Sequence, residues 1–295
     1  MAEPPNNFSS NWRGPGHGAC NMTRVKWLSH VAAKQHPGNA SAFADAFLKG
    51  CDQPSAWRFK DAATYFDHAW QPAQESCTTN VMFGGASKNS GVVDGSYTTC
   101  GRSGHALNQA LAGGRAPCSV VSVGLNDDTS FEEALHLAAP SCCFRGYDGS
   151  LKGVVHGKNR SALAVRLPQF LRFNDNHFTA RNWEEHRGTS ISLFKIDCEG
   201  CEISILNPVL WLRQQICIEQ ILVEVHRGGS GKGKDPCAHS PYTNGHVSSD
   251  QDQVMKVHKL LTAFDEAQLD VFWRARGGGP GGCILFGAVR RTPCP

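Results

Sequence analysis

The sequence contains no apolar run long enough to cross a membrane, and it shows no internal repeat. Its first residues, 1–10, also lack the basic region followed by an apolar stretch that is typical of a secretory leader. From the sequence as given we therefore expect no membrane span and no leader, and it stays open whether an anchor was trimmed from a longer protein.

A strong charge of either sign is absent as well. The formal net charge is +3, the isoelectric point is about 8.2, and the basic residues are scattered along the chain instead of being grouped. Proteins that bind nucleic acid concentrate Lys and Arg on one face. We therefore expect no nucleic-acid partner.

The central motif is an apolar, β-branched run that ends at a glycine, Ser119-Val120-Val121-Ser122-Val123-Gly124. Such a run cannot alternate between a core face and a solvent face, so it predicts a strand that is covered on both sides, as in a doubly wound parallel sheet. A helix is expected over residues 130–139, with Asp128 or Thr129 as its N-cap, followed by a second strand over residues 141–147. Ligands in such sheets bind at the carboxyl ends of the strands.

The residues after these two strands favour an adenosine-type cofactor. Asp148 follows the second strand 24 positions after Gly124, which is where nucleoside-binding α/β folds place an acid for the ribose hydroxyls. The other two glycines of a dinucleotide fingerprint are missing, and Asp127 and Asp128 would repel a pyrophosphate. S-adenosylmethionine has no phosphate and carries two cationic groups, so the same acids can accompany it. We therefore expect the turn with Gly124 and Asn126, together with Asp148, to bind S-adenosylmethionine.

The rest of the chain predicts one catalytic domain over residues 76–295, preceded by an arm and short helices over residues 1–75. Further strands are expected within residues 162–173, at 191–196, at 218–225, and as a final pair at 269–276 and 283–290. Further helices are expected at residues 105–111 and 176–186, and a last one around Val254 to Phe264. A long polar loop over residues 228–250 is long enough to cover the site.

Thirteen cysteines is a high number for a reduced cytosolic enzyme, although an odd number cannot all pair within one chain. Glycosylation sequons begin at Asn7, Asn21, Asn39 and Asn159. The lumen of the secretory pathway and the cytoplasm therefore both stay open as compartments. In an oxidising compartment, the segment 76–101 predicts a loop or hairpin closed by a disulfide between Cys77 and Cys100.

Several motifs together resemble the methyltransferase-like 24 group, which is related to the FkbM-type O-methyltransferases. The segments that carry the resemblance are Ser122-Val123-Gly124, Phe131-Glu132, Tyr147-Asp148, the run Leu193-Phe194-Lys195-Ile196-Asp197-Cys198-Glu199-Gly200, and Leu222-Val223-Glu224-Val225-His226. Asp94-Gly95 with Cys77 and Cys100 is similar to the cysteine-flanked segment that precedes the first strand in that group. The resemblance covers about residues 65–290, and the chain departs from it at Cys283-Ile284-Leu285, where the group usually has an acid.

The resemblance implies a Rossmann-like α/β fold with a seven-stranded, mostly parallel, doubly wound sheet whose last strand is antiparallel, here with an N-terminal helical extension. It also implies S-adenosylmethionine as the methyl donor, with Gly124 and Asp148 as cofactor contacts.

Three polar residues are expected at the tips of neighbouring strands, where methyl transfer would occur. Asp197 follows the fourth strand, and Glu224 and His226 lie at the end of the fifth. Transfer of a methyl group to oxygen requires positioning and removal of the hydroxyl proton, and His226 is the candidate base, with Asp197 and Glu224 beside it. Asp197 is also a candidate cofactor contact.

A divalent metal bound by Asp197, Glu224 and His226 is the alternative way to activate the acceptor, and it is not favoured. Glu199 and Glu202 could join that metal site, but the dipole at a helix start also accounts for acids at these positions. Zinc at Cys198-x-x-Cys201 is less favoured still, because no second pair would complete four ligands.

The expected function is O-methylation of a hydroxyl group on a small molecule or a glycan. Two other functions stay open: a non-catalytic binding or scaffold protein that keeps the fold, and a nicotinamide-dependent oxidoreductase. The sequence does not name the acceptor.

Overall fold

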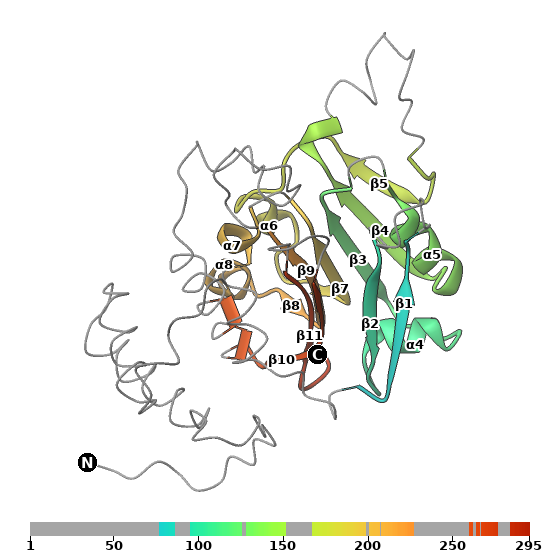
Figure 1. The fold of residues 1–295 in the computed structure, drawn as a ribbon. Coiled ribbons are helices and arrows are strands. Elements are labelled where there is room, and N and C mark those ends of the chain that lie inside the picture. The colour runs from blue at the N-terminus through green and yellow to red at the C-terminus, as the bar shows by residue number, and fades with distance from the viewer. Residues whose placement is uncertain are drawn as a thin grey trace, which may run out of the picture.

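The computed structural model describes residues 77–85, 95–125, 128–151, 167–198, 201–206, 208–226, 260–261, 264–265, 267–276 and 284–295. Its centre is a seven-stranded sheet with helices on both faces (Figure 1). The strands of this sheet are β3 (Cys118–Val123), β4 (Cys142–Tyr147), β5 (Leu171–Asn174), β7 (Leu193–Ile196), β9 (Gln220–Val225), β10 (Leu269–Arg276) and β11 (Ile284–Arg290). The predicted central strand is β3.

The strand order is β10-β11-β9-β7-β3-β4-β5. Strands β3, β4, β5, β7 and β9 run parallel, and β11 runs antiparallel to both of its neighbours. This confirms the predicted Rossmann-like sheet with its last strand antiparallel. Because the chain leaves β3 toward β4 on one side and returns to β7 on the other, the order reverses at β3, and such a switch point is where open α/β sheets bind ligands.

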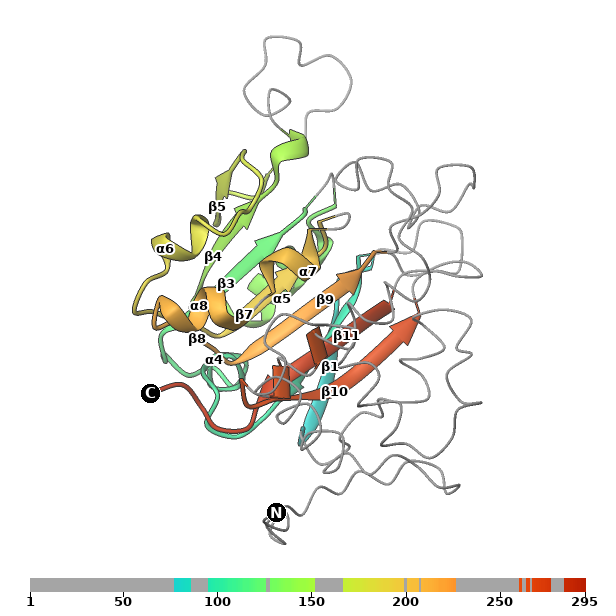
Figure 2. The same ribbon diagram turned by 90° about the vertical axis from the view of Figure 1, so that its left-hand side faces the viewer.

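Both faces of the sheet are covered, as the continuous apolar strands require. Helices α4 (Ala106–Leu111) and α5 (Ser130–Ala138) lie on one face (Figure 1). The opposite face carries α6 (Asn182–Glu185), α7 (Glu202–Ile205) and α8 (Pro208–Arg213), as the turned view in Figure 2 shows. Neighbouring residues of β3 therefore belong to different hydrophobic cores. Val121 and Val123 pack toward α6 to α8, while Val120 packs toward α4 and α5.

A hairpin of β1 (Thr79–Phe83) and β2 (Tyr97–Gly101) lies over the face that carries α4 and α5. Cys77 and Cys100 form the predicted disulfide at its base. The side chain of Gln220 in β9 fixes the hairpin to the sheet, because it accepts a hydrogen bond from the Cys100 N–H at 3.0 Å and donates one to the Cys100 carbonyl at 2.7 Å.

Three further disulfides join described residues. Cys118 and Cys142 are register partners at the starts of β3 and β4, Cys217 binds the C-terminal Cys294, and Cys198 binds Cys201. Among the described cysteines, only Cys143 is free, and it is exposed.

Some predicted elements are shorter than expected. The helix expected over residues 176–186 is limited to α6, and the strands expected at 191–196 and 218–225 are each interrupted. Ser192 ends β6 (Ser190–Ile191) before β7 begins, and its hydroxyl oxygen accepts a hydrogen bond from the Ser119 N–H at 3.1 Å. The two short starts, β6 and β8 (Cys217–Ile218), pair with each other in a small parallel sheet of their own.

The expected N-terminal extension over residues 1–75 and the polar loop over residues 228–250 lie outside the described residues, as does most of the helix expected around Val254 to Phe264. In the part of the chain that the structure describes, no helix is long and apolar enough to span a membrane.

Candidate active site

The turn after β3 is built around Gly124, which has a φ of +76°. A Cβ atom at this position would lie 1.5 Å from the carbonyl oxygen of Asp197, so glycine is required because the end of β7 packs directly against the turn. The Gly124 N–H also donates to the Tyr147 carbonyl at 2.9 Å. Gly124 therefore brings together the carboxyl ends of β3, β4 and β7.

Asp148 follows β4 and faces this turn. Its Oδ2 accepts a hydrogen bond from the Leu125 N–H at 2.9 Å, and its Oδ1 accepts one from the Ser150 N–H at 2.8 Å. The Ser150 hydroxyl donates to the same Oδ1. Asp148 is 7% exposed. The carboxylate thus orders both turns at the switch point, which is the position predicted for the ribose contact, while Asn126 lies outside the described residues.

Asp197 follows β7 and meets a tyrosine from the hairpin. The Tyr97 hydroxyl donates to Asp197 Oδ2 at 3.0 Å. Burial, and next the charge of Asp197, hold the pKa of Tyr97 well above its usual range, so this hydroxyl keeps its proton and acts as a donor. Burial also raises the pKa of the Asp197 carboxyl, against the opposing influence of Lys195 and His226.

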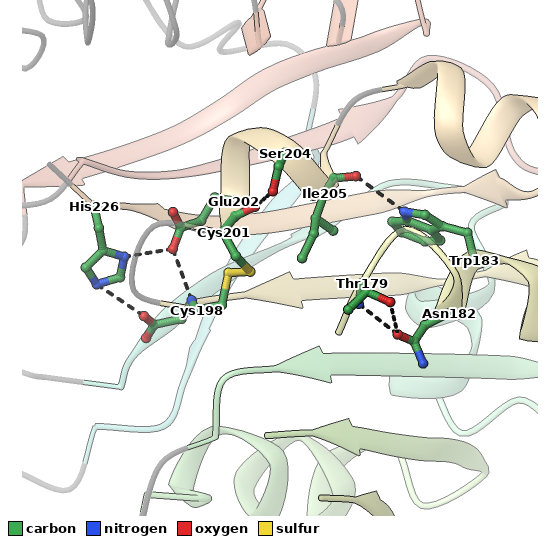
Figure 3. The surroundings of a disulfide bond; sticks show 10 residues. Thr179, Asn182, Trp183, Cys198, Cys201, Glu202, Ser204, Ile205 and His226 are labelled. Atoms are coloured by element: carbon green, nitrogen blue, oxygen red, sulfur yellow. Dashed lines mark hydrogen bonds and ion pairs between the residues drawn. A yellow bond between two sulfur atoms is a disulfide. The ribbon is translucent and has the colours of Figure 1, made fainter. Parts of the chain in front are cut away.

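His226, just after β9, lies between two carboxylates (Figure 3). Its Nδ1 is 2.8 Å from Glu202 Oε1, and its Nε2 is 3.5 Å from Asp197 Oδ1. Glu202 is fully buried, and the same Oε1 accepts the Cys198 N–H at 3.0 Å. The Glu202 carboxylate therefore favours a proton on Nδ1 and directs Nε2 toward Asp197. Asp197 is the more open partner, with a side chain that is 23% exposed against 4% for His226.

A second polar cluster lies beneath the Gly124 turn. The Lys195 ammonium donates to the Gly124 carbonyl at 3.1 Å and forms an ion pair with Glu132 Oε1 at 3.7 Å. The Ser122 hydroxyl donates to the same Glu132 oxygen. Both members of the ion pair are almost completely buried, and the second carboxylate oxygen of Glu132 has no hydrogen-bond partner among the described residues. This cluster attaches the turn to helix α5 from inside the core.

The three predicted catalytic residues lie at or just after the ends of β7 and β9. Asp197 and His226 are brought together, and the imidazole of His226 also contacts Glu202 through its Nδ1. Within the described ranges, no group of three or more His, Cys, Asp and Glu side chains is arranged to hold a metal ion. The alternative metal set of Asp197, Glu224 and His226 is therefore not assembled, and the Cys198-x-x-Cys201 pair is a disulfide instead of a zinc site.

Sequence reasoning missed the roles of Glu202, Tyr97 and Lys195 in this site. The helix dipole seemed sufficient to explain an acid at position 202. Tyr97 gave no signal, because its contact with Asp197 spans 100 residues of sequence. Lys195 did give one: a lysine inside an otherwise apolar strand is almost never buried without a partner.

Comparison with known families finds one match, over part of the chain. Residues 169–270 match a methyltransferase domain family. The matched range includes Asp197, Glu202 and His226, and it begins after Gly124 and Asp148. A methyltransferase domain implies S-adenosylmethionine as its methyl donor, in agreement with the prediction from the first two strands. No curated protein matches the chain.

Solved structures that are similar to the chain include several methyltransferases. The Methanococcus jannaschii fibrillarin pre-rRNA processing protein is 6% identical and has a TM-score of 0.38, over 59% of this chain and 67% of its own. An O-methyltransferase family protein from Burkholderia thailandensis is 12% identical with a TM-score of 0.33, over 61% of this chain and 52% of its own. A mutant 16S rRNA (adenine(1408)-N(1))-methyltransferase from Catenulisporales acidiphilia with cosubstrate SAM is 14% identical with a TM-score of 0.34, over 64% and 91%. Similarity at this level says nothing about the substrate.

Proposed function

We propose that this protein is an S-adenosylmethionine-dependent O-methyltransferase that acts on a hydroxyl group of a small molecule or a glycan, as the resemblance to the methyltransferase-like 24 group and the FkbM-type enzymes suggests. The observation that carries the proposal is the Glu202–His226–Asp197 arrangement beside the Gly124 turn. A base oriented by a buried carboxylate, at the switch point of a methyltransferase-type sheet, is what hydroxyl methylation requires.

The residues around β3 and β4 have the chemistry that the donor needs. Asp148 supplies a buried carboxylate that can accept hydrogen bonds from ribose hydroxyls, and the Gly124 turn adjoins it through the hydrogen bond from the Leu125 N–H. Asn126 stays a predicted cofactor contact from the sequence. Asp197 adds negative charge where the cationic end of the donor would lie. When bound, the donor supplies a methyl group on a sulfonium, and every other task falls to the protein.

Proton removal is the task of His226 in this proposal. The buried Glu202 carboxylate keeps a proton on Nδ1, so the Nε2 lone pair is available to the acceptor hydroxyl. When Nε2 takes that proton, the positive imidazolium lies between Glu202 and Asp197, and both carboxylates stabilise it. The acceptor would approach from the side of Asp197, because this side chain is the more exposed of the pair. Glu224, near the end of the strand that leads to His226, would add negative charge close to this pair.

Donor binding can be measured without knowing the acceptor. Calorimetric titration should show binding of S-adenosylmethionine or its demethylated product at micromolar concentrations. We expect Asp148→Ala to weaken it by about tenfold to a hundredfold, the value of a hydrogen bond to a charged group. Thr79→Ala, a substitution in the hairpin away from Asp148, is the control. If neither ligand produces heat with the unmodified protein, the proposal is wrong.

The base assignment has a separate test. Once a screen for methylated products has found an acceptor, His226→Ala should lower turnover by about a hundredfold or more and leave donor binding almost unchanged, because the base acts on the acceptor. Activity should also survive a chelator. Loss of activity with a chelator, its recovery with Mg²⁺ or Mn²⁺, and equal damage from Asp197→Asn would instead favour a metal mechanism.

Two alternatives make different predictions in the same assays. A nicotinamide-dependent oxidoreductase would bind NAD in place of S-adenosylmethionine. A scaffold protein that keeps the fold would bind the donor, or nothing, and would methylate no member of a broad panel of hydroxyl compounds. The Asp148 carboxylate already accepts hydrogen bonds from Leu125 and Ser150, and this observation favours the scaffold function.

The disulfides favour one of the two compartments left open by the sequence. Four disulfides join described residues, and structural disulfides are rare in a reducing cytosol. We therefore propose the lumen of the secretory pathway as the compartment, where a glycan hydroxyl is an available acceptor. Neither the sequence nor the charge distribution suggests a nucleic-acid substrate.

A further inference from the structure

We propose that the Cys198–Cys201 disulfide is a thiol–disulfide exchange site, and that its reduction by a low-molecular-weight thiol changes the way in which Asp197 and Glu202 hold His226. The inference rests on the proposed function only for its consequence, a methyltransferase whose site responds to the thiol state of its surroundings.

The disulfide links the two carboxylates that flank the imidazole. Cys198 directly follows Asp197, and Cys201 directly precedes Glu202 (Figure 3). The S–S bond closes the segment between them with a Cα–Cα distance of 5.5 Å. It therefore fixes the spacing of two side chains that contact opposite nitrogens of His226.

A hydrogen bond makes the connection tighter. The Cys198 N–H donates to Glu202 Oε1, which is the oxygen that also contacts His226 Nδ1. The backbone at Cys201 is in turn fixed by α7, because its carbonyl accepts hydrogen bonds from the Ser204 hydroxyl and the Ile205 N–H. Any movement of Cys198 away from Cys201 must therefore stretch the contact between Cys198 and Glu202 and shift the imidazole.

This disulfide differs from the other three in what it contributes to the fold. The Cys77–Cys100, Cys118–Cys142 and Cys217–Cys294 bonds close segments with separations of 23, 24 and 77 residues, whereas Cys198–Cys201 spans only 3. The stabilisation from a disulfide grows with the length of the loop that it closes. Cys198–Cys201 thus constrains the unfolded chain least, and both of its cysteines are half-buried.

Reduction of the disulfide requires a low-molecular-weight thiol such as glutathione, and its re-formation requires the corresponding disulfide. Two glutathione molecules supply two electrons and two protons, the Cys198–Cys201 S–S bond breaks to give two Sγ–H groups, and glutathione disulfide forms. The reverse reaction consumes glutathione disulfide and restores the bond. Each direction passes through a mixed disulfide between one cysteine and glutathione.

The experiment measures the thiols and the imidazole separately, on the full chain. The protein is equilibrated in glutathione buffers of increasing reducing strength, free thiols are trapped by alkylation, and mass spectrometry identifies the labelled cysteines. The imidazole ¹⁵N resonances of His226 are recorded in the same buffers. We expect labelling at Cys198 and Cys201 while Cys118–Cys142 stays intact, together with a shift of the His226 resonances over the same range of buffers.

Two paired variants assign the response. Cys198→Ser with Cys201→Ser should give His226 resonances that no longer change with the buffer. Cys217→Ser with Cys294→Ser is the matched control, because its two cysteines are also half-buried, and it should keep the full response. The wild-type titration stands by itself if either variant fails to fold.

The proposal is overturned if Cys198 and Cys201 stay oxidised until Cys118–Cys142 is reduced, or if they become labelled while the His226 resonances stay in place. Calorimetry separates this outcome from a failure of the proposed function. A redox response of His226 in a protein that binds no methyl donor would contradict the methyltransferase proposal alone, and donor binding without a redox response would contradict the exchange site alone.

Discussion

Replacement of Gly124 by alanine isolates the close approach between the two central strand ends. Two costs arise at this position. The left-handed backbone conformation costs an alanine about 1–2 kcal/mol. In addition, the new Cβ would lie 1.5 Å from the Asp197 carbonyl oxygen, so the backbone at the end of β7 has to move. Forcing extra volume into a packed site costs about 1–3 kcal/mol, which brings the expected total to about 2–5 kcal/mol.

Gly113 provides the matched control. It has nearly the same conformation, with a φ of +79° against +76°, but nothing lies within 4 Å of the position that a Cβ would occupy. Gly113→Ala should therefore show only the conformational cost of about 1–2 kcal/mol. Both variants are compared with the unmodified protein by denaturant unfolding under oxidising conditions. Donor titration should show a further effect of Gly124→Ala alone, because only this substitution displaces Asp197. Equal losses of stability in the two variants would refute the assignment of a close strand approach.

Two other predictions test groups buried in the core. His105 is fully buried, and burial, together with the charges of two nearby arginines, lowers its pKa to about 4. Below pH 6.5 the His105 imidazole binds a proton in the unfolded chain but not in the folded protein, so the free energy of unfolding falls as the pH drops from 6.5 toward 4. His105→Phe should remove up to about 3 kcal/mol of that loss. Denaturant unfolding at pH 7 and at pH 4 measures the difference. Lys195→Met should cost about 3–5 kcal/mol, because it leaves the buried Glu132 carboxylate without its cation, and adding Glu132→Gln should recover at least about 1 kcal/mol of it. A double variant less stable than Lys195→Met would contradict this ion-pair argument.

The sequence predicted the sheet well because its strands are buried on both faces and therefore carry continuous apolar runs. The same runs mark where each strand ends, which is why Gly124, Asp148, Asp197 and His226 were all expected on one edge of the sheet. Helix lengths were predicted less well. The stretch expected as a helix over residues 176–186 forms only α6, because an apolar spacing shows which side chains can pack together and does not require that the backbone between them is helical.

The contacts across the site could not be predicted for a different reason. Which acid contacts His226 Nδ1 depends on the distance between α7 and the end of β9. No local feature of the sequence encodes that distance. Glu224 lies two residues before His226 in the sequence, and Glu202 reaches the Nδ1 of the same imidazole from α7. Proximity in sequence therefore pointed to Glu224 and gave no sign of the additional contact with Glu202.

Several ionisable side chains are buried where β3, β7 and β9 end, and we infer that they serve a function and not stability. Glu132, Lys195, Glu202 and His226 all have side chains that are at most 5% exposed. Buried ion pairs can often be replaced by well-packed apolar residues with no loss of stability, or with a gain. A chain that needed only a firm core could have carried apolar side chains at these positions. Because the charges instead gather where β3, β7 and β9 end, beside a turn that only glycine can form, we infer that they serve the chemistry at that edge of the sheet.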